Sequence, residues 1–215
     1  MKDNKSVVIW LLSGCFLIFI MVLIGGITRL TDSGLSMSTW SLIGGAPPLN
    51  FQEWVVAFDI YKQTPEGKIN SHYTLADFKY IFFWEYLHRM LGRLLGLVFI
   101  IPFGYFLIKK KLSKKMIIKC CILLFMGASQ GLIGWWMVQS GLIDRPDVSH
   151  YRLAIHLTTA FLTCSYTFWV ALSLIFPNSR TGNKLVFTKL IVLLILLIIQ
   201  IVYGAFVAGL KAGRI

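Results

Sequence analysis

Long apolar stretches that contain no Asp, Glu, Lys or Arg recur along this chain. A helix needs about 20 residues to cross the roughly 30 Å hydrocarbon core of a bilayer. Four stretches have about that length and predict membrane-spanning helices: residues 7–28, 120–138, 153–177 and 190–210.

Residues 81–108 form a fifth candidate, which is apolar without interruption only from Leu94 onward. Its first half carries four ionisable side chains, Glu85, His88, Arg89 and Arg93. We predict that it also spans the membrane, because a polar segment precedes it and five lysines follow it between positions 109 and 115. The expected fold is therefore an all-α integral membrane protein, a helical bundle of five transmembrane helices.

One large segment, residues 30–80, lies between the first two predicted spans. Within it, residues 52–61 predict a short amphipathic helix with Trp54, Phe58 and Tyr61 on one side. We expect this segment to form one long outer loop that acts as a lid or docking surface.

The composition excludes soluble and disordered classes of protein. Hydrophobic residues make up 57% of the 215 residues and charged residues only 14%, against roughly 45–50% and 25% in soluble domains. Disordered segments have low hydrophobicity, which is the opposite of this chain. The formal net charge of +12 could indicate nucleic-acid binding, so the distribution of the charge has to decide.

The basic residues follow the predicted topology. Five alternating spans place the N-terminus and residues 109–119 and 177–189 on one side, with eleven basic residues and one acidic residue. The positive-inside rule makes this side, and with it the N-terminus, cytoplasmic. We expect a multi-pass protein of the bacterial inner membrane, with membrane lipid around it and no nucleic-acid partner.

Two histidines lie at the same depth on two spans that run in the same direction. His88 and His156 are each about 30 Å above the cytoplasmic end of their helices, at 1.5 Å per residue. Their side chains can form helix–helix hydrogen bonds, or they can meet at one metal ion. A structural zinc ion wants three or four ligands, whereas a haem iron needs only two axial ligands and apolar walls. We therefore expect a bound haem.

Other polar side chains surround the predicted haem. Glu85 lies three residues before His88 and shares its helix face, where it can carry protons, support the histidine or pair with Arg89. Arg89, Arg93 and Arg152 lie at the outer end of the site and suit haem propionates, although snorkelling to the interface would explain them too. Two further histidines, His72 and His150, are expected to be exposed in loops.

Small residues recur on the predicted spans, and they allow either close helix packing or the entry of a flat ligand. They are Gly25 and Gly26 in the first span, Gly92 and Gly96 in the second, and Gly127, Gly131 and Gly134 in the third.

Several sequence strings make the chain similar to haem A synthase, in the branch found in alphaproteobacteria and mitochondria. The resemblance extends over nearly the whole chain and includes the strings GGITRLT at 25–31, SGLSM at 33–37, YKQTPE at 61–66, EYLHRMLGR at 85–93, QGLIGWWMV at 130–138, YRLA at 151–154 and GAFVAGL at 204–210.

The resemblance implies a specific activity. The family oxidises the C8 methyl group of haem O to a formyl group by successive hydroxylations, which gives haem A for terminal oxidases. It implies that His88 and His156 are the axial ligands of the substrate iron near the periplasmic side. It also implies that Glu85 is catalytic, by taking a proton or by stabilising a cationic centre.

The resemblance also implies a longer protein, because the family folds as an eight-helix pseudo-repeat. Residues 1–176 correspond to its first four-helix bundle, including the 30–80 loop. Residues 177–215 correspond to a cytoplasmic loop and the first helix of the second bundle. The family's second haem, haem B, has ligands that would lie beyond Ile215.

Two other classes of protein fit the same residues. A membrane b-type cytochrome needs the histidine pair for electron transfer but no carboxylate, and a transporter would use the polar cluster as an ion path. Expected partners of the enzyme are haem O synthase, an electron donor or acceptor, and a second copy of the chain in a homo-oligomer.

Overall fold

The computed structural model describes residues 4–37, 44–143, 146–177 and 184–212, and these residues contain seven helices and no strand. Five helices are long and apolar enough to cross a membrane: α1 (Lys5–Leu30), α4 (Leu75–Ile108), α5 (Lys114–Leu142), α6 (His150–Ile175) and α7 (Lys184–Gly209). The chain is therefore an all-α, multi-pass membrane protein, as the apolar pattern predicts.

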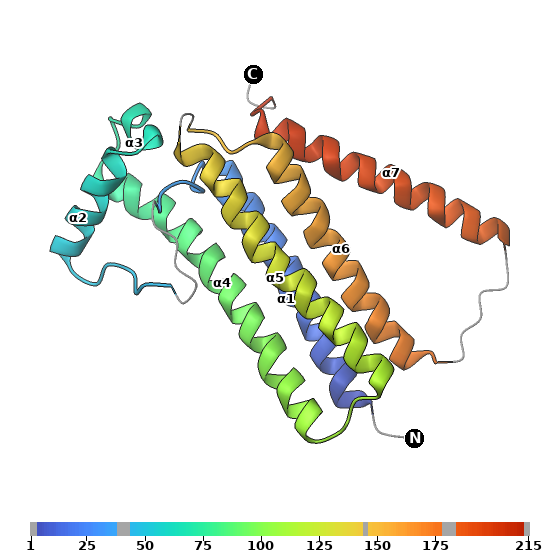
Figure 1. Ribbon diagram of the computed structural model, residues 1–215. Coiled ribbons are helices and arrows are strands. Elements are labelled where there is room, and N and C mark those ends of the chain that lie inside the picture. The colour runs from blue at the N-terminus through green and yellow to red at the C-terminus, as the bar shows by residue number, and fades with distance from the viewer. Residues whose placement is uncertain (1–3, 38–43, 144–145, 178–183, 213–215) are drawn as a thin grey trace.

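Four of the long helices form an antiparallel bundle (Figure 1). Helices α1 and α5 run toward the upper end of the view, and α4 and α6 run toward the lower end. Both α1 and α5 pack against α4 and α6. Helices α4 and α6 therefore face each other diagonally across the bundle, and residues at matching heights on them can share its interior.

The segment between α1 and α4, residues 31–74, is shorter than the predicted loop and contains helices of its own. These are α2 (Phe51–Lys62), which the amphipathic pattern predicts, and the short α3 (Pro65–Ile69). Helix α4 begins at Leu75, so residues 75–80 of the predicted outer segment form the first turns of this helix. A capping box explains this start: the Thr74 side chain accepts from the Asp77 N–H, and the Asp77 carboxylate accepts from the Thr74 N–H.

Helix α2 packs against the first turns of α4 through aromatic rings. Phe58, Tyr61, Phe78, Ile81 and Phe82 are buried together, and the ring of Phe58 stacks on that of Phe78 with centroids 5.3 Å apart. The α1–α4 connection is therefore anchored to the bundle by a small apolar core of its own.

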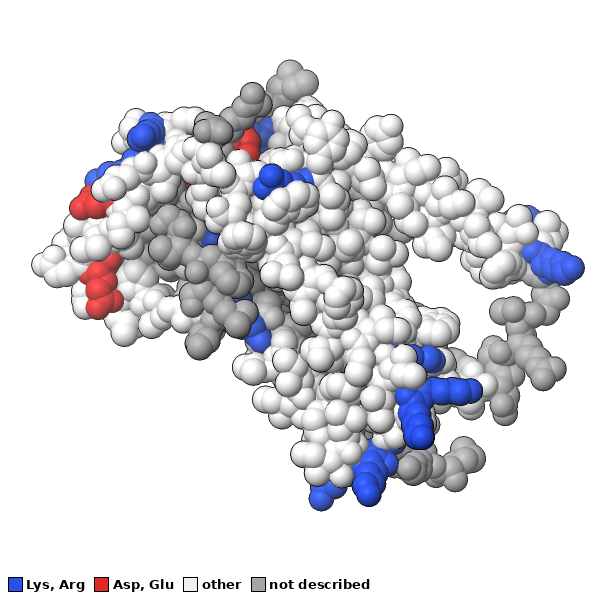
Figure 2. All heavy atoms as spheres, in the orientation of Figure 1, with Lys and Arg blue, Asp and Glu red and all other residues white. Residues whose placement is uncertain are grey.

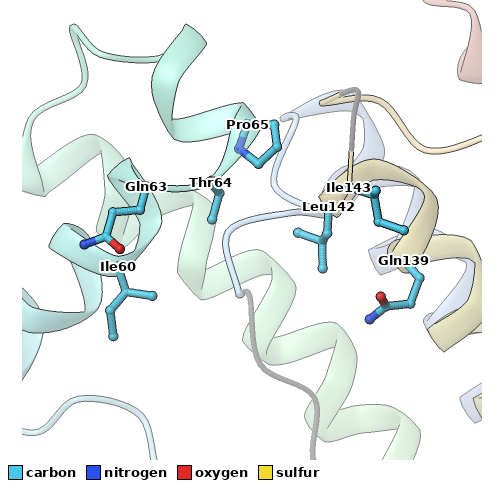
Figure 3. Close-up of a pocket in the computed structure, with 7 residues that line it drawn as sticks. All are labelled: Ile60, Gln63, Thr64, Pro65, Gln139, Leu142 and Ile143. Atoms are coloured by element: carbon cyan, nitrogen blue, oxygen red, sulfur yellow. The ribbon is translucent and has the colours of Figure 1, made fainter.

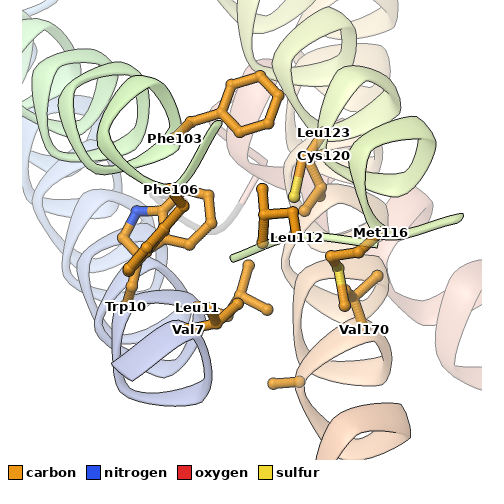
Figure 4. Close-up of a cluster of buried hydrophobic side chains, with 11 residues drawn as sticks. Val7, Trp10, Leu11, Phe103, Phe106, Leu112, Met116, Cys120, Leu123 and Val170 are labelled. Carbon is orange, nitrogen blue, oxygen red and sulfur yellow. The ribbon is translucent and has the colours of Figure 1, made fainter. Parts of the chain in front are cut away.

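The lower half of the bundle holds the main apolar core, which Figure 4 shows. Trp10 on α1 lies among the rings of Phe99, Phe103 and Phe106 on α4. Its indole Nε1 donates to the backbone oxygen of Val98 at 2.9 Å. Proline has no N–H, so Pro102 cannot donate to the carbonyl four residues earlier, which is that of Val98. Trp10 supplies the donor that the proline removes.

The C-terminal end of helix α7 packs against the upper end of the bundle (Figure 1). Arg29 on α1 donates to the backbone oxygens of Ala208 at 2.8 and 3.0 Å and of Gly209 at 2.9 Å. These carbonyls belong to the last turn of α7, which has no helical N–H partners and carries partial negative charge. The guanidinium of Arg29 therefore caps α7 from a neighbouring helix.

Charged side chains are distributed unevenly between the two ends of the bundle. In Figure 2 the visible acidic side chains lie at the upper end, and only basic side chains are visible at the lower end. The lower end includes Lys109, Lys110, Lys111, Lys114 and Lys115. Residues 1–3 and 178–183, which the sequence-based count of charges includes, lie outside the described residues.

The Trp10–Val98 hydrogen bond gives a first test. Replacing Trp10→Phe should destabilise the protein by about 1–3 kcal/mol, because a buried carbonyl oxygen loses its donor. In a Pro102→Ala background the helix supplies its own N–H to Val98, so the same Trp10→Phe change should cost clearly less. Thermal unfolding in detergent, followed by circular dichroism, measures both. An equal loss in the two backgrounds would show that Trp10 acts through packing alone.

Glu66, in α3, gives a second test. Its side chain is only 7% exposed, and its Oε2 has no hydrogen-bond partner among the described residues. Burial, together with the negative charges of Glu85 and Asp32, raises the pKa of Glu66 from 4.5 to about 8. The folded state therefore binds this proton more tightly than the unfolded state, and the protonated group's contribution to stability is lost as pH rises between these values.

We expect proteolysis of the α1–α4 connection to become faster between about pH 4.5 and pH 8 in the native chain, but to change less in Glu66→Gln. Replacing Asp59→Asn is the matched control, because Asp59 is exposed and its ion pair with Lys62, at 3.2 Å, lies at the surface of α2. An identical pH dependence in Glu66→Gln and the native chain would contradict this assignment.

Candidate functional site

His88, on α4, lies directly against the backbone of α1. A Cβ atom added to Gly25 would lie 3.1 Å from His88 Cε1 and 3.6 Å from its Nδ1. Few real Cβ contacts are this short, so a larger residue at position 25 would require the ring to shift by a few tenths of an ångström. The Nδ1 atom is buried and has no hydrogen-bond partner in the part of the chain that the structure describes.

His156, on α6, has a corresponding position against α5. A Cβ added to Gly134 would lie 3.1 Å from His156 Cε1 and 3.5 Å from its Nε2. The Gln130 carboxamide, one turn earlier on α5, lies 3.2 Å from Nδ1 of the same ring. Each imidazole thus packs against a glycine of a neighbouring helix: His88 against Gly25 of α1, and His156 against Gly134 of α5.

The two imidazoles belong to the diagonally opposed helices α4 and α6 and lie at matching heights. Each lies roughly 30 Å from the lower end of its helix, at 1.5 Å per residue. This arrangement leaves two nitrogen ligands available to one iron atom from two sides of the bundle interior.

Glu85 lies one turn above His88 and is almost fully buried, with 3% of its side chain exposed. Its Oε2 accepts from the Ser36 hydroxyl at 2.6 Å and from the Met37 N–H at 2.9 Å. Its Oε1 pairs with Arg89 Nη2 at 2.5 Å. The Glu85–Arg89 ion pair, one of the alternatives that the spacing allows, is therefore formed. The α1–α4 connection supplies two further donors, the Ser36 hydroxyl and the Met37 N–H.

The three arginines of the predicted propionate ring all contact the protein. Arg89 also donates to the Met37 carbonyl at 3.1 Å, and the guanidinium of Arg93 lies against Gly44, whose φ is +84°. Arg152 on α6 donates to the Trp136 carbonyl at 2.6 Å and lies 4.4 Å above the Trp136 ring. Arg89 and Arg93 thus tie the α1–α4 connection to α4, while Arg152 ties α6 to α5.

The residue types fit a haem with two axial ligands. The described residues contain no cluster of three or more His, Cys, Asp or Glu side chains that could hold a bare metal ion. A haem iron requires only the histidine pair. The buried Nδ1 of His88 has no hydrogen-bond partner among the described residues, so this ring is not satisfied by the part of the protein that the structure describes.

A separate cavity of about 350 Å³ lies between the α1–α4 connection and the upper end of α5 (Figure 3). Ile60, Gln63 and Pro65 line one side, and Gln139 and Leu142 line the other. None of the predicted site residues lines it, so it is distinct from the histidine pair.

Sequence reasoning missed several contacts of the site. Ser36 and the Met37 N–H lie 49 and 48 residues before Glu85, so no local pattern connects them. Gln130 stood in a recognised string without an assigned role. The prediction that His150 is an exposed loop residue is wrong: it begins α6, and its Cβ would lie 2.6 Å from a Cβ added to Gly209.

The close approach at Gly134 gives a direct test. Replacing Gly134→Ala should displace the His156 ring by a few tenths of an ångström and weaken haem binding. Gly131→Ala, one turn earlier on the same helix, is the matched control, because an added Cβ there meets nothing within 4 Å. Titration of the purified protein with haem, followed by visible absorption, measures both affinities. Equal affinities for the two variants would mean that the contact does not place the ring.

Comparisons with known proteins show the family of the chain. Residues 8–215 match the family model described as cytochrome oxidase assembly protein. The chain is 59% identical to a haem A synthase from Flavobacterium psychrophilum, over 100% of this chain and 65% of that protein. It is also 59% identical to the haem A synthase of Flavobacterium johnsoniae, over 100% of this chain and 64% of that protein. It is 44% identical to the haem A synthase of Paramagnetospirillum magneticum, over 99% of this chain and 62% of that protein.

The chain thus spans slightly less than two thirds of the length of the curated relatives that it matches. No solved structure matches it. With a family model that covers residues 8–215 and relatives of this identity, the chain belongs to the haem A synthase family of cytochrome oxidase assembly proteins.

Proposed function

We propose that this chain takes part in the oxidation of the C8 methyl group of haem O to a formyl group, which gives haem A for terminal oxidases. The observation that supports it most is the buried, ion-paired Glu85 one turn from His88. A protein that only transfers electrons through a haem needs the histidine pair but gains nothing from a buried carboxylate beside it. A buried charge in a membrane-spanning helix is energetically costly, so its presence points to a functional role.

In this proposal haem O is the substrate, and His88 and His156 hold its iron from opposite faces. Gly25 and Gly134 fix the positions of the two rings. The outer arginines, Arg89, Arg93 and Arg152, surround the end of the site to which the propionates would point. Arg89 and Arg152 also contact protein acceptors, and an arginine can pair with a propionate through charge-assisted hydrogen bonds.

Glu85 would act through its charge. The oxidation removes hydrogen from the methyl carbon, and positive charge develops next to the porphyrin ring as it proceeds. A carboxylate that is held by Ser36, Met37 and Arg89 presents negative charge at a fixed place, without reorganisation during the reaction. The arrangement favours this electrostatic role over proton transfer, because the carboxylate oxygens already accept strong hydrogen bonds.

The charge distribution supports an orientation for the site. The lysines of the lower end mark it as cytoplasmic by the positive-inside rule, so the upper end, with the site and the α1–α4 connection, would face the periplasm of a bacterial inner membrane. The reaction also needs a supply of haem O, water as the source of the formyl oxygen, and an acceptor for the four electrons that are removed with four protons. Haem O synthase and an oxidoreductase partner are the corresponding candidates, and the haem B that the family resemblance implies is a candidate acceptor.

The proposal is tested by replacing Glu85→Gln, which removes the charge and nearly keeps the shape. We expect at least about a 10²-fold loss of haem A formation, the scale for removing one preorganised electrostatic contact, with haem absorption retained. The assay is extraction and chromatography of haems from cells that contain the chain in its full natural protein. Asp59→Asn is the control and should leave the product unchanged.

Three outcomes separate the candidate functions. Loss of haem A with retained haem absorption supports the enzyme. An unchanged rate in Glu85→Gln removes the carboxylate from the mechanism and favours a b-type cytochrome that transfers electrons. The absence of any haem absorption in the purified native protein contradicts both and favours an ion path through the polar cluster.

A further inference from the structure

Glu66, on the short helix α3, is a buried acid that the proposed reaction has not used. The residue is almost fully buried, and its Oε2 has no hydrogen-bond partner within the described ranges. Buried polar atoms normally have a partner, and a buried acid without one is a candidate for binding and releasing protons. The reaction needs such a group, because the carboxylate of Glu85 already accepts three hydrogen bonds.

The backbone around Glu66 is held closely against α2. The Thr64 side chain caps the start of α3 by accepting from the Gly67 N–H at 3.1 Å. At Gly67 the two helices approach so closely that an added Cβ would overlap the Tyr61 carbonyl oxygen. The Asn70 carboxamide, which follows α3, donates to the Tyr61 hydroxyl at 3.0 Å. Helix α3 is therefore fixed on α2, and with it the position of Glu66.

Charges from several elements act on Glu66. The groups are Glu85 on α4, Asp32 after α1, Asp147 before α6, Lys211 after α7, Tyr61 on α2 and Tyr73 before α4. Helix α5, which also packs against α3, has no ionisable side chain after Cys121. Burial is the largest cause of the raised pKa of Glu66, and the neighbouring carboxylates add to it. Glu66 therefore exchanges its proton close to neutral pH.

The acidic groups become more exposed from the bundle interior toward its upper end. Glu85 and Glu66 are buried, whereas the side chain of Asp32 is 27% exposed and that of Asp147 is 48% exposed. Lys211 connects the two aspartates, with its Nζ 3.4 Å from Asp32 Oδ1 and 3.0 Å from Asp147 Oδ1. These three residues, which we call the outer ion group, lead from the surroundings of Glu66 to solvent.

We propose that Glu66 accepts the protons that the oxidation of haem O releases and passes them to solvent through the outer ion group. This inference rests on the proposed function. Conversion of a methyl to a formyl group with one water removes four electrons and four protons, and the electrons go to the electron acceptor of that reaction. Each proton converts the Glu66 carboxylate to the carboxylic acid, which then releases it to the outer ion group and to water.

The test measures haem A formation against pH in membranes that contain the chain in its full natural protein. Only the ionised carboxylate can accept a proton, so the native rate should rise with pH and level off above about pH 8. Glu66→Gln should lower the rate by about 10²-fold and remove this rise, with haem absorption and the KM for haem O unchanged. Glu66→Asp keeps an acid and should restore much of the rate.

Two surface variants test the pH profile without changing Glu66, so they decide the question even where Glu66→Gln fails to fold. Asp147→Asn removes a negative charge that raises the pKa of Glu66, so the rise in rate should move to lower pH. Lys211→Gln removes a positive charge that lowers this pKa, so the rise should move to higher pH. Asp59→Asn, at the surface of α2, is the matched control and should leave the profile unchanged.

A native rate in Glu66→Gln, or shifts in the same direction for Asp147→Asn and Lys211→Gln, would overturn the inference. A carboxyl group that only stabilised the fold would not give opposite shifts in the two surface variants. Loss of rate in Glu85→Gln together with an unaffected Glu66→Gln refutes only proton acceptance by Glu66. If Glu85→Gln leaves the rate unchanged as well, the proposed function itself fails.

Discussion

The site depends on two helix positions where no Cβ separates an imidazole from a neighbouring backbone. At Gly25 on α1 and Gly134 on α5, an added methyl group would lie 3.1 Å from an imidazole carbon, so the ring would have to shift by a few tenths of an ångström. Because α1 and α5 both pack against the two histidine helices, these contacts fix the rings with respect to the same four-helix framework. Close helix packing at the two glycines therefore fixes the positions of the two imidazole rings.

A second constraint is the buried charge of Glu85. A carboxylate within a membrane-spanning helix requires compensation, and Arg89 with two donors of the α1–α4 connection provides it. Arg89 also donates to the Met37 carbonyl, so the residue that pairs with Glu85 ties the α1–α4 connection to α4. Structure and proposed chemistry use the same contacts here: the groups that stabilise the charge also fix its position.

The spans could be predicted from the sequence because a bilayer requires long apolar runs, and residues 7–28 and 190–210 supply them without any charge. Their exact ends depend on capping contacts such as Thr74 with Asp77, which lie outside those runs. The Glu85–Arg89 pair follows from their spacing on one helix. The contacts of Ser36 with Glu85 and of His150 with Gly209 join distant segments, so only the folded chain reveals them.

The central claim is that His88 and His156 bind one iron. Electron paramagnetic resonance of the ferric haem complex tests it most directly, because two imidazole ligands give a low-spin signal and the loss of one gives a high-spin signal. The account predicts a low-spin signal for the native protein and a high-spin signal for both His88→Ala and His156→Ala. A low-spin signal that survives unchanged in both variants would contradict it.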